Sequence, residues 1–108
     1  MLYISNAFSI GMIQDKEVTL KVTEVSTETV KSLLQAKSWT SAVGHQGTSD
    51  ILTNLLNIEV PMNRIALKLQ KGDMLIVFQL LVRLEEGKVL TKEEIEQLPF
   101  KFFTVEVI

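Results

Sequence analysis

With 108 residues, the chain is long enough for one domain with its own core, and its composition, 46% hydrophobic and 22% charged, is that of an ordinary folded chain. The absence of cysteine excludes disulfide bonds, a thiol nucleophile and cysteine-ligated metals. A formal net charge of −2 argues against a broad basic face for long nucleic acid, but it leaves room for a small phosphorylated ligand.

The chain shows no sign of export or of division into parts. Its first residues lack the basic flank and long apolar region of a signal peptide, and no apolar run approaches the roughly 18 residues of a membrane span. Neither an internal repeat nor a linker divides residues 1–108. We therefore expect one domain in a cytoplasmic protein that has no membrane partner.

The first half of the chain begins with two predicted strands and a helix. Residues 1–5 form a short apolar run, and residues 17–25 alternate between apolar and polar side chains, as a strand does. Residues 6–14, between the two strands, have no clear period and are expected to be a loop. Ser26 or Thr27 can cap the helix that follows.

A third strand and a second helix complete this half. Residues 39–43 are predicted as a short strand. Thr48 or Ser49 can cap the second helix, because both side chains can accept a hydrogen bond from a backbone N–H of the first turn. Four apolar residues at helical spacing form its buried stripe: Ile51, Leu52, Leu55 and Leu56.

The second half opens after Pro61. Residues 64–69 alternate in polarity and are predicted as a strand, and residues 71–73 provide a turn. The apolar run 74–83 is predicted as a long strand in the centre of the sheet.

The end of the chain is predicted as a helix and a last strand. Thr91 and Glu94 match a capping box at a helix start, Pro99 ends that helix, and residues 101–107 form the strand. Together these elements predict a single α/β domain, in which helices pack against a mixed β-sheet of about five strands.

Residues 44–49, just before the second helix, include the chain's one histidine, His45. A helix N-terminus offers free backbone N–H groups to a phosphate, and Thr48 or Ser49 can add a hydroxyl donor. Histidine is the residue type that changes its charge near neutral pH, so His45 could move a proton beside that phosphate. Taken alone, these residues favour the simpler interpretation of a loop histidine followed by an ordinary helix cap.

Two arginines and a glutamine are the other candidates for a site. Gln79 and Arg83 project to the same face of the predicted strand 74–83, and the guanidinium group of Arg83 suits a phosphate. Equally, Gln79 could be a satisfied buried amide and Arg83 could pair with a neighbouring glutamate. Arg64 could contact a ligand or simply be solvated. The sequence contains no phosphate-binding loop or dinucleotide fingerprint, and one histidine without cysteine argues against a transition-metal site.

Four segments together resemble a known family. Asn6-Ala7-Phe8-Ser9, Gly44-His45, Asn63-Arg64 and above all Arg83-Leu84-Glu85-Glu86-Gly87-Lys88-Val89-Leu90 are similar to the small ring nucleases of archaeal viruses and bacterial mobile elements. The viral proteins act as anti-CRISPR proteins against type III systems. The resemblance covers nearly the whole chain.

The resemblance implies a homodimer that binds cyclic tetra-adenylate across its two-fold axis and cleaves it without a metal or other cofactor. A ribose 2′-hydroxyl would attack the adjacent phosphorus, with His45 as the general acid, Glu86 assisting it and Arg83 stabilising the phosphate. The remaining residues implied to bind the ligand are Asn6, Ser9, Thr48, Arg64 and Gln79.

Two other functions remain open on the sequence alone. A dimeric module could bind a cyclic nucleotide, nucleic acid or a protein partner without cleaving anything, and Arg64, Arg83 and Gln79 would serve it equally well. A structural subunit could use residues 74–82 as an interface. Only His45 together with Glu86 argues for catalysis.

Overall fold

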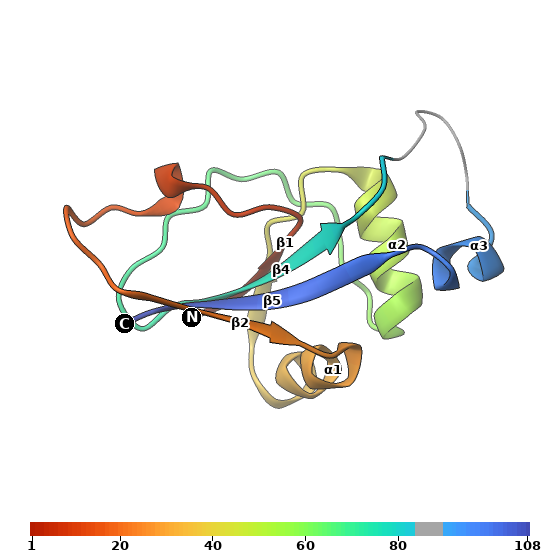
Figure 1. Ribbon diagram of the computed structural model, residues 1–108, viewed down its shortest axis with the longest axis horizontal. Coiled ribbons are helices and arrows are strands. Elements are labelled where there is room, and N and C mark those ends of the chain that lie inside the picture. Colours follow the sequence, from red (N-terminus) through yellow and green to blue (C-terminus); the bar gives the residue numbers. More distant parts are fainter. Residues whose placement is uncertain (84–89) are drawn as a thin grey trace.

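Five strands form one mixed sheet in the computed structural model, which describes residues 1–83 and 90–108. The strand order is β2-β5-β4-β1-β3, and the first four of these strands are labelled in Figure 1. The strands are β1 (Leu2–Ser5), β2 (Leu20–Val25), β3 (Trp39–Ser41), β4 (Met74–Leu80) and β5 (Phe100–Val107). β1 runs parallel to β3 and β4, whereas β5 runs antiparallel to β4 and β2. The predicted α/β domain with a mixed sheet of about five strands is confirmed.

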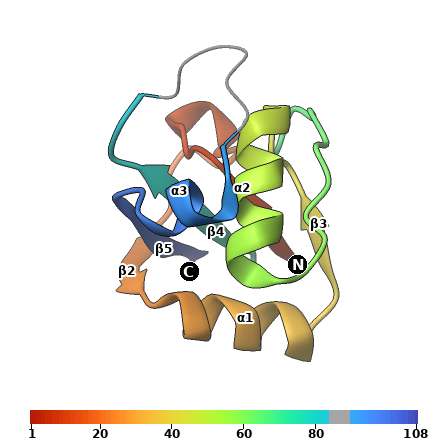
Figure 2. The same cartoon turned by 90° about the vertical axis from the view of Figure 1, so that its right-hand side faces the viewer.

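Three helices contribute to the core on one side of the sheet. They are α1 (Thr27–Ala36), α2 (Gln46–Leu56) and α3 (Lys92–Glu96) (Figure 2). The core there joins apolar side chains of all three helices to Phe78 and Phe102 of the sheet, both about 1% exposed. This packing holds the middle and the end of α2 against the sheet.

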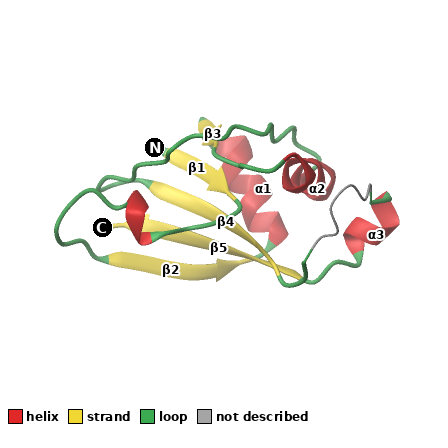
Figure 3. Ribbon diagram, turned by 90° about the horizontal axis from the view of Figure 1, so that it is seen from above, coloured by secondary structure: helices red, strands yellow, loops and turns green. Residues whose placement is uncertain are grey.

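Irregular chain covers the other face of the sheet (Figure 3). Leu67 and Leu69 belong to the core cluster on this face and pack with Leu75 and Val77 of β4. The short 3₁₀ helix η1 (Ile10–Met12) lies in the other covering segment. A second apolar core therefore forms without helices.

The predicted strand 64–69 is wrong. Around it the chain makes only isolated bridges, Val43 with Met62 and Ile13 with Leu69. Burial explains part of the misleading alternation, because Leu67 and Leu69 are buried against the sheet while Lys68 between them is exposed; Ile65, the first apolar residue of the run, is itself exposed. Alternate side chains can be buried without strand pairing.

Other strand boundaries also differ from the predictions. β4 ends at Leu80 rather than at residue 83, and β2 begins at Leu20 rather than at residue 17. β3 is shorter than predicted, ending at Ser41, and β5 begins one residue earlier, at Phe100. Each boundary follows where backbone pairing begins or stops, which apolar composition does not specify.

The predicted caps and turn are confirmed elsewhere. Ser26 accepts a hydrogen bond from the backbone of Thr29 at the start of α1, and Thr91 with Glu94 forms the capping box of α3. Gly72 has φ of +94° in the predicted turn, a conformation that favours glycine. Within residues 1–83 and 90–108, no helix is long and apolar enough to cross a membrane.

Candidate functional site

The carboxyl ends of three parallel strands meet at one edge of the sheet. Asn6 follows β1, Gly44 and His45 follow β3, and Arg83 follows β4. Because β1 lies between β3 and β4 and is parallel to both, the segments after these strands leave the sheet on the same side. Loops at this edge of parallel strands commonly form binding sites.

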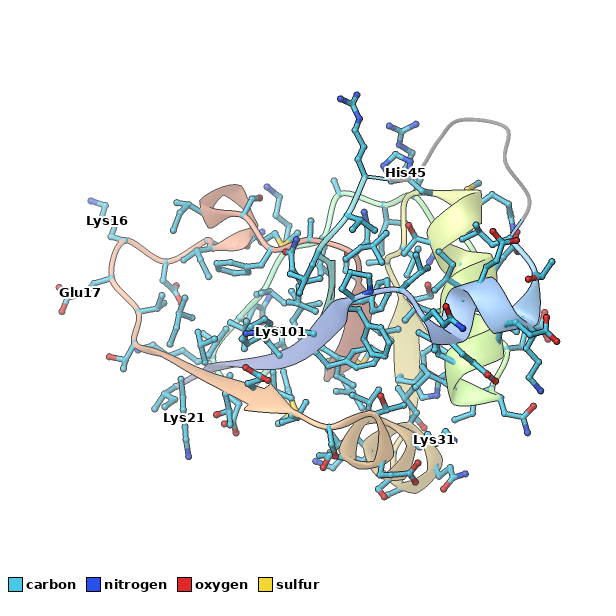
Figure 4. All side chains as sticks on the ribbon, turned by 45° about the vertical axis from the view of Figure 1, so that its right-hand side comes forward. Lys16, Glu17, Lys21, Lys31, His45 and Lys101 are labelled. Carbon is cyan, nitrogen blue, oxygen red and sulfur yellow. The ribbon has the colours of Figure 1, made fainter. Side chains whose placement is uncertain are left out.

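His45 begins α2, in the N-cap position. Its backbone is extended, with φ of −132° and ψ of 132°, and its side chain makes no capping hydrogen bond. The side chain is exposed and projects from the surface (Figure 4). The imidazole is therefore available to a ligand rather than used by the fold.

The predicted caps of α2, Thr48 and Ser49, are wrong, because the helix starts at Gln46. Both residues lie in its first turn. The buried hydroxyl of Ser49 donates to the backbone carbonyl of Val60 and so ties α2 to the segment before Pro61. Thr48 is half-buried in the first turn of the helix. It therefore lies near the free N–H groups of the helix N-terminus, where a bound phosphate was expected.

Arg64 lies next to the His45 loop. A Cβ atom added to Gly44 would lie 3.8 Å from Cγ of Arg64, so the aliphatic stem of this arginine runs beside the residue that precedes His45. Arg64 is itself exposed. The structure thus brings the stem of Arg64 beside the residue that precedes His45, although Arg64 and His45 are 19 positions apart in the sequence.

Asn6 is bonded to the same loop. Its Oδ1 accepts a hydrogen bond of 3.2 Å from the backbone N–H of Gly44, and its neighbour Ser5 donates through Oγ to the carbonyl of Ala42 at 3.0 Å. Ser9 is exposed just before η1, and no hydrogen bond joins it to Asn6 or His45 in the part of the chain that the structure describes. The structure therefore links Asn6, but not Ser9, to the His45 loop.

Gln79 and Arg83 mark the β4 side of the edge. Gln79 is exposed near the end of β4, and its Nε2 donates to the carbonyl of Leu80 at 3.2 Å. The expectation that Gln79 could be a buried amide is wrong. Arg83 is exposed three residues after the strand ends, so it does not project from the strand as predicted. Glu86, the proposed helper of His45, lies outside the described residues.

The charges at this edge suit an anion. Among the described residues, neither Arg64 nor Arg83 forms an ion pair with a carboxylate. Backbone N–H groups at the start of α2 add partial positive charge beside His45. Residues 1–83 and 90–108 contain no cluster of three potential metal ligands among histidine and acidic residues.

A shallow groove of about 520 Å³ lies beside this edge, between α2 and the segment before residue 63. Asp50 and Glu59 line it, and Gln46 within it donates to Asp50 at 2.9 Å. Two carboxylates make this groove a poor place for a phosphate. The arginines and His45 are outside its lining, so we place the candidate site at the strand ends and not in the groove.

Asn63, part of the Asn63-Arg64 motif, is a residue for which the sequence alone indicated no role. Its Nδ2 donates to the carbonyl of Ser41 at 2.7 Å, and its backbone N–H donates to the carbonyl of Val43 at 2.8 Å. The signal in the sequence is an asparagine two residues after Pro61. Its role depends on hydrogen bonds to Ser41 and Val43, which the sequence alone does not reveal.

Comparisons with known proteins agree with this architecture. Uncharacterized protein 26 of Sulfolobus islandicus filamentous virus is 42% identical over 109 residues, covering 100% of this chain and 92% of that protein. Uncharacterized protein YddF of Bacillus subtilis is 28% identical over 85 residues, covering 77% of this chain and 79% of that protein. The structure of B116 of Sulfolobus turreted icosahedral virus matches with a TM-score of 0.88 at 27% identity, covering 97% of both chains. The family model described as STIV B116-like matches residues 2–102. The chain therefore belongs to the STIV B116-like family.

Proposed function

We propose that this protein is a ring nuclease that binds cyclic tetra-adenylate between two copies of the chain and cleaves it without a metal. Cleavage to linear di-adenylate ending in a 2′,3′-cyclic phosphate would antagonise type III CRISPR signalling. The observation that carries the proposal is His45, an exposed N-cap residue whose side chain makes no capping hydrogen bond to α2. The stem of Arg64 lies beside Gly44, the residue before it. A general acid, a cation and free backbone N–H groups at one edge are what phosphodiester cleavage requires.

The chemistry needs little from the protein because the nucleophile belongs to the substrate. The ribose 2′-hydroxyl attacks the neighbouring phosphorus, its proton passes to solvent, and the bond to the 5′-oxygen breaks. The His45 imidazolium donates a proton to the departing 5′-oxygen, leaving a 5′-hydroxyl and a 2′,3′-cyclic phosphate. Positioning and a proton donor together account for this type of catalysis.

A two-fold dimer suits a cyclic ligand, because an isologous interface presents the same groups to opposite sides of a ring. Two exposed apolar residues directly precede Arg83, with Leu81 52% and Val82 43% exposed. Apolar side chains in this exposed position would be covered if a second copy packed against this edge. In that dimer, Gln79 and Arg83 of both copies face one shared cavity.

One observation favours a second candidate, a dimer that sequesters the cyclic nucleotide without cleaving it. Arg64, Gln79 and Arg83 are all exposed and can contact a phosphorylated ligand whether or not His45 acts as an acid. Binding by these three residues does not require a proton donor.

The deciding experiment incubates excess purified protein with cyclic tetra-adenylate in EDTA and separates the products. We expect linear di-adenylate with a 2′,3′-cyclic phosphate end as the product. His45→Ala should bind with nearly unchanged affinity, because the proton is given only in the transition state, while its cleavage rate falls by roughly 10²–10⁴-fold.

Asn54→Ala provides the control, since Asn54 is an exposed residue on the same helix and its side chain donates only to the carbonyl of Asp50. It should cleave at the wild-type rate. Intact ligand after long incubation with wild-type protein would replace the nuclease proposal by sequestration, provided that the ligand is bound. Cleavage by His45→Ala at the wild-type rate would remove His45 from its role.

A further inference from the structure

We propose that Asn63 is a positioning residue that holds Arg64 against the Gly44–His45 loop, because its carboxamide replaces a backbone donor that Pro61 lacks. This inference rests on the proposed function, since it assigns a role in binding the phosphodiester ligand. Asn63 itself would not touch that ligand.

The backbone beyond β3 explains why an amide is needed. Val43 forms a parallel bridge with Met62, and the N–H of Asn63 donates to the carbonyl of Val43 at 2.8 Å, as a parallel ladder requires. Further along that ladder, the next backbone donor on the side of residues 61–63 would be the N–H of residue 61, bonding to the carbonyl of Ser41. Residue 61 is proline, which has no N–H.

The side chain of Asn63 supplies the missing donor. Its Nδ2 lies 2.7 Å from the carbonyl oxygen of Ser41, which therefore keeps a partner in a residue only 4% exposed. The hydroxyl of Ser41 completes the link by donating to the carbonyl of Pro61 at 2.6 Å. Three hydrogen bonds thus hold residues 61–63 alongside residues 41–43, although no regular strand forms.

The position of Arg64 follows from this link. Arg64 is the residue directly after Asn63, and its Cγ lies 3.8 Å from where a Cβ of Gly44 would be. On its far side, the Gly44 loop is held by the bond from its N–H to Oδ1 of Asn6. Asn63 and Asn6 therefore fix the two sides of the loop that carries His45, and Asn63 alone also fixes the arginine.

A double-mutant cycle tests whether Asn63 acts through Arg64. Affinity for cyclic tetra-adenylate is measured by calorimetry with His45→Ala present in every protein, so that the ligand stays intact. Asn63→Ala should weaken affinity by roughly 3- to 10-fold, the size expected when a binding cation loses a hydrogen-bonded support. With Arg64→Ala also present, the same change should alter affinity by less than about twofold, because the group it positions is gone.

Two further variants secure the interpretation. Asn54→Ala removes a comparable bond, from a side-chain amide to a backbone carbonyl at 2.8 Å, but one within α2; it should leave affinity unchanged with and without Arg64. Asn63→Leu keeps nearly the volume of Asn63 and removes the donor without adding charge, so it should behave like Asn63→Ala and serves in its place if the alanine variant does not fold.

The outcomes separate the two proposals. If Asn63→Ala or Asn63→Leu weakens binding equally with and without Arg64, Asn63 acts by another route and this inference alone is overturned. An unchanged affinity of both variants overturns it as well. If the protein carrying only His45→Ala, and wild-type protein mixed with the same ligand, show no binding, the proposed function fails and this inference fails with it.

Discussion

His45 is exposed at a position where most side chains serve the helix. An N-cap side chain usually accepts a hydrogen bond from the first turn, and this imidazole makes none. Its neighbours in space are the stem of Arg64 and the loop bonded to Asn6, both brought there from other parts of the chain. At the scale of single residues, the candidate site consists of exposed polar groups on a hydrogen-bonded support.

Arg83 and Gln79 should separate catalysis from binding. Arg83→Ala should weaken both ligand affinity and single-turnover cleavage, because a cation facing a phosphate acts before and during the reaction. Gln79→Ala should mainly weaken binding, since an uncharged amide gains little as charge develops on the phosphate. Calorimetry in the presence of His45→Ala and rapid-quench kinetics on the single variants measure the two quantities.

Lys101 provides the comparison for charge. It lies opposite Gln79 on β5, and its Nζ is 3.5 Å from a carboxylate oxygen of Glu24. Lys101→Ala removes a positive charge of the sheet that is already paired, so affinity and rate should stay within about twofold of wild type. An Arg83→Ala variant that matches Lys101→Ala in both measurements would remove Arg83 from the site.

At the scale of elements, the start of α2 combines a free helix terminus with a residue that does not cap it. Ser26 at α1 and Thr91 at α3 both accept a hydrogen bond from the third residue of their helix. The hydroxyls of α2 that could cap are already inside the helix, and Ser49 is bonded to Val60. The N–H groups of the first turn of α2 therefore remain available to an anion.

Replacing His45 by a capping residue should stabilise the protein while it removes catalysis. Asparagine is among the preferred N-cap residues, so His45→Asn should raise the free energy of unfolding by about 0.5–1 kcal/mol. Its amide cannot donate a proton as an acid, so cleavage should fall as in His45→Ala. Urea denaturation and single-turnover kinetics check the two effects.

Ser26→Ala serves as the reference for the size of a cap in this fold, and it should lower the free energy of unfolding by about 1 kcal/mol. If His45→Asn is less stable than the wild type, the imidazole makes a stabilising contact in solution. The interpretation that the side chain of His45 contributes nothing to stability would then be wrong.

At the scale of the whole molecule, the sheet has two unlike sides. Helices cover one side and irregular segments cover the other, while the carboxyl ends of β1, β3 and β4 carry the candidate site. The exposed apolar residues Leu81 and Val82 lie just beyond β4 at this edge. This arrangement leaves the site at the rim of one chain and gives a second copy room to enclose it.

Charge introduced at this edge should break the proposed dimer. Leu81→Glu would place a carboxylate where two copies meet, so the mass by light scattering at micromolar concentration should fall to that of a monomer and ligand affinity should be lost. Val22→Glu is the matched control. Val22 is 60% exposed in β2, the outer strand on the side of the sheet away from β3, and it does not belong to the segments that follow β1, β3 and β4. It should remain dimeric, and a monomeric wild-type protein would contradict the proposed assembly.

Most of the helices and strands, and the class of fold, could be predicted from the sequence alone. Alternation predicted β2, helical spacing with Ser26 predicted α1, and the capping box at Thr91 predicted α3, because each of these signals is local. Patterns also placed His45 before the second helix. The resemblance to viral proteins, which rests above all on residues 83–90 together with Asn6–Ser9, Gly44-His45 and Asn63-Arg64, agrees with membership of the STIV B116-like family.

Features that depend on pairing between distant segments could be recognised only in the tertiary structure. Leu67 and Leu69 of the alternating residues 64–69 are buried against the sheet without pairing as a strand, and nothing within those residues distinguishes that from a strand. Likewise, the role of Asn63 depends on the carbonyl of Ser41, 22 positions earlier, which accepts its side-chain hydrogen bond. It also depends on Pro61, which has no N–H to bond to that carbonyl. Hydrophobic periodicity records which side chains leave water, whereas hydrogen-bond partners across the chain are chosen by the packed backbone.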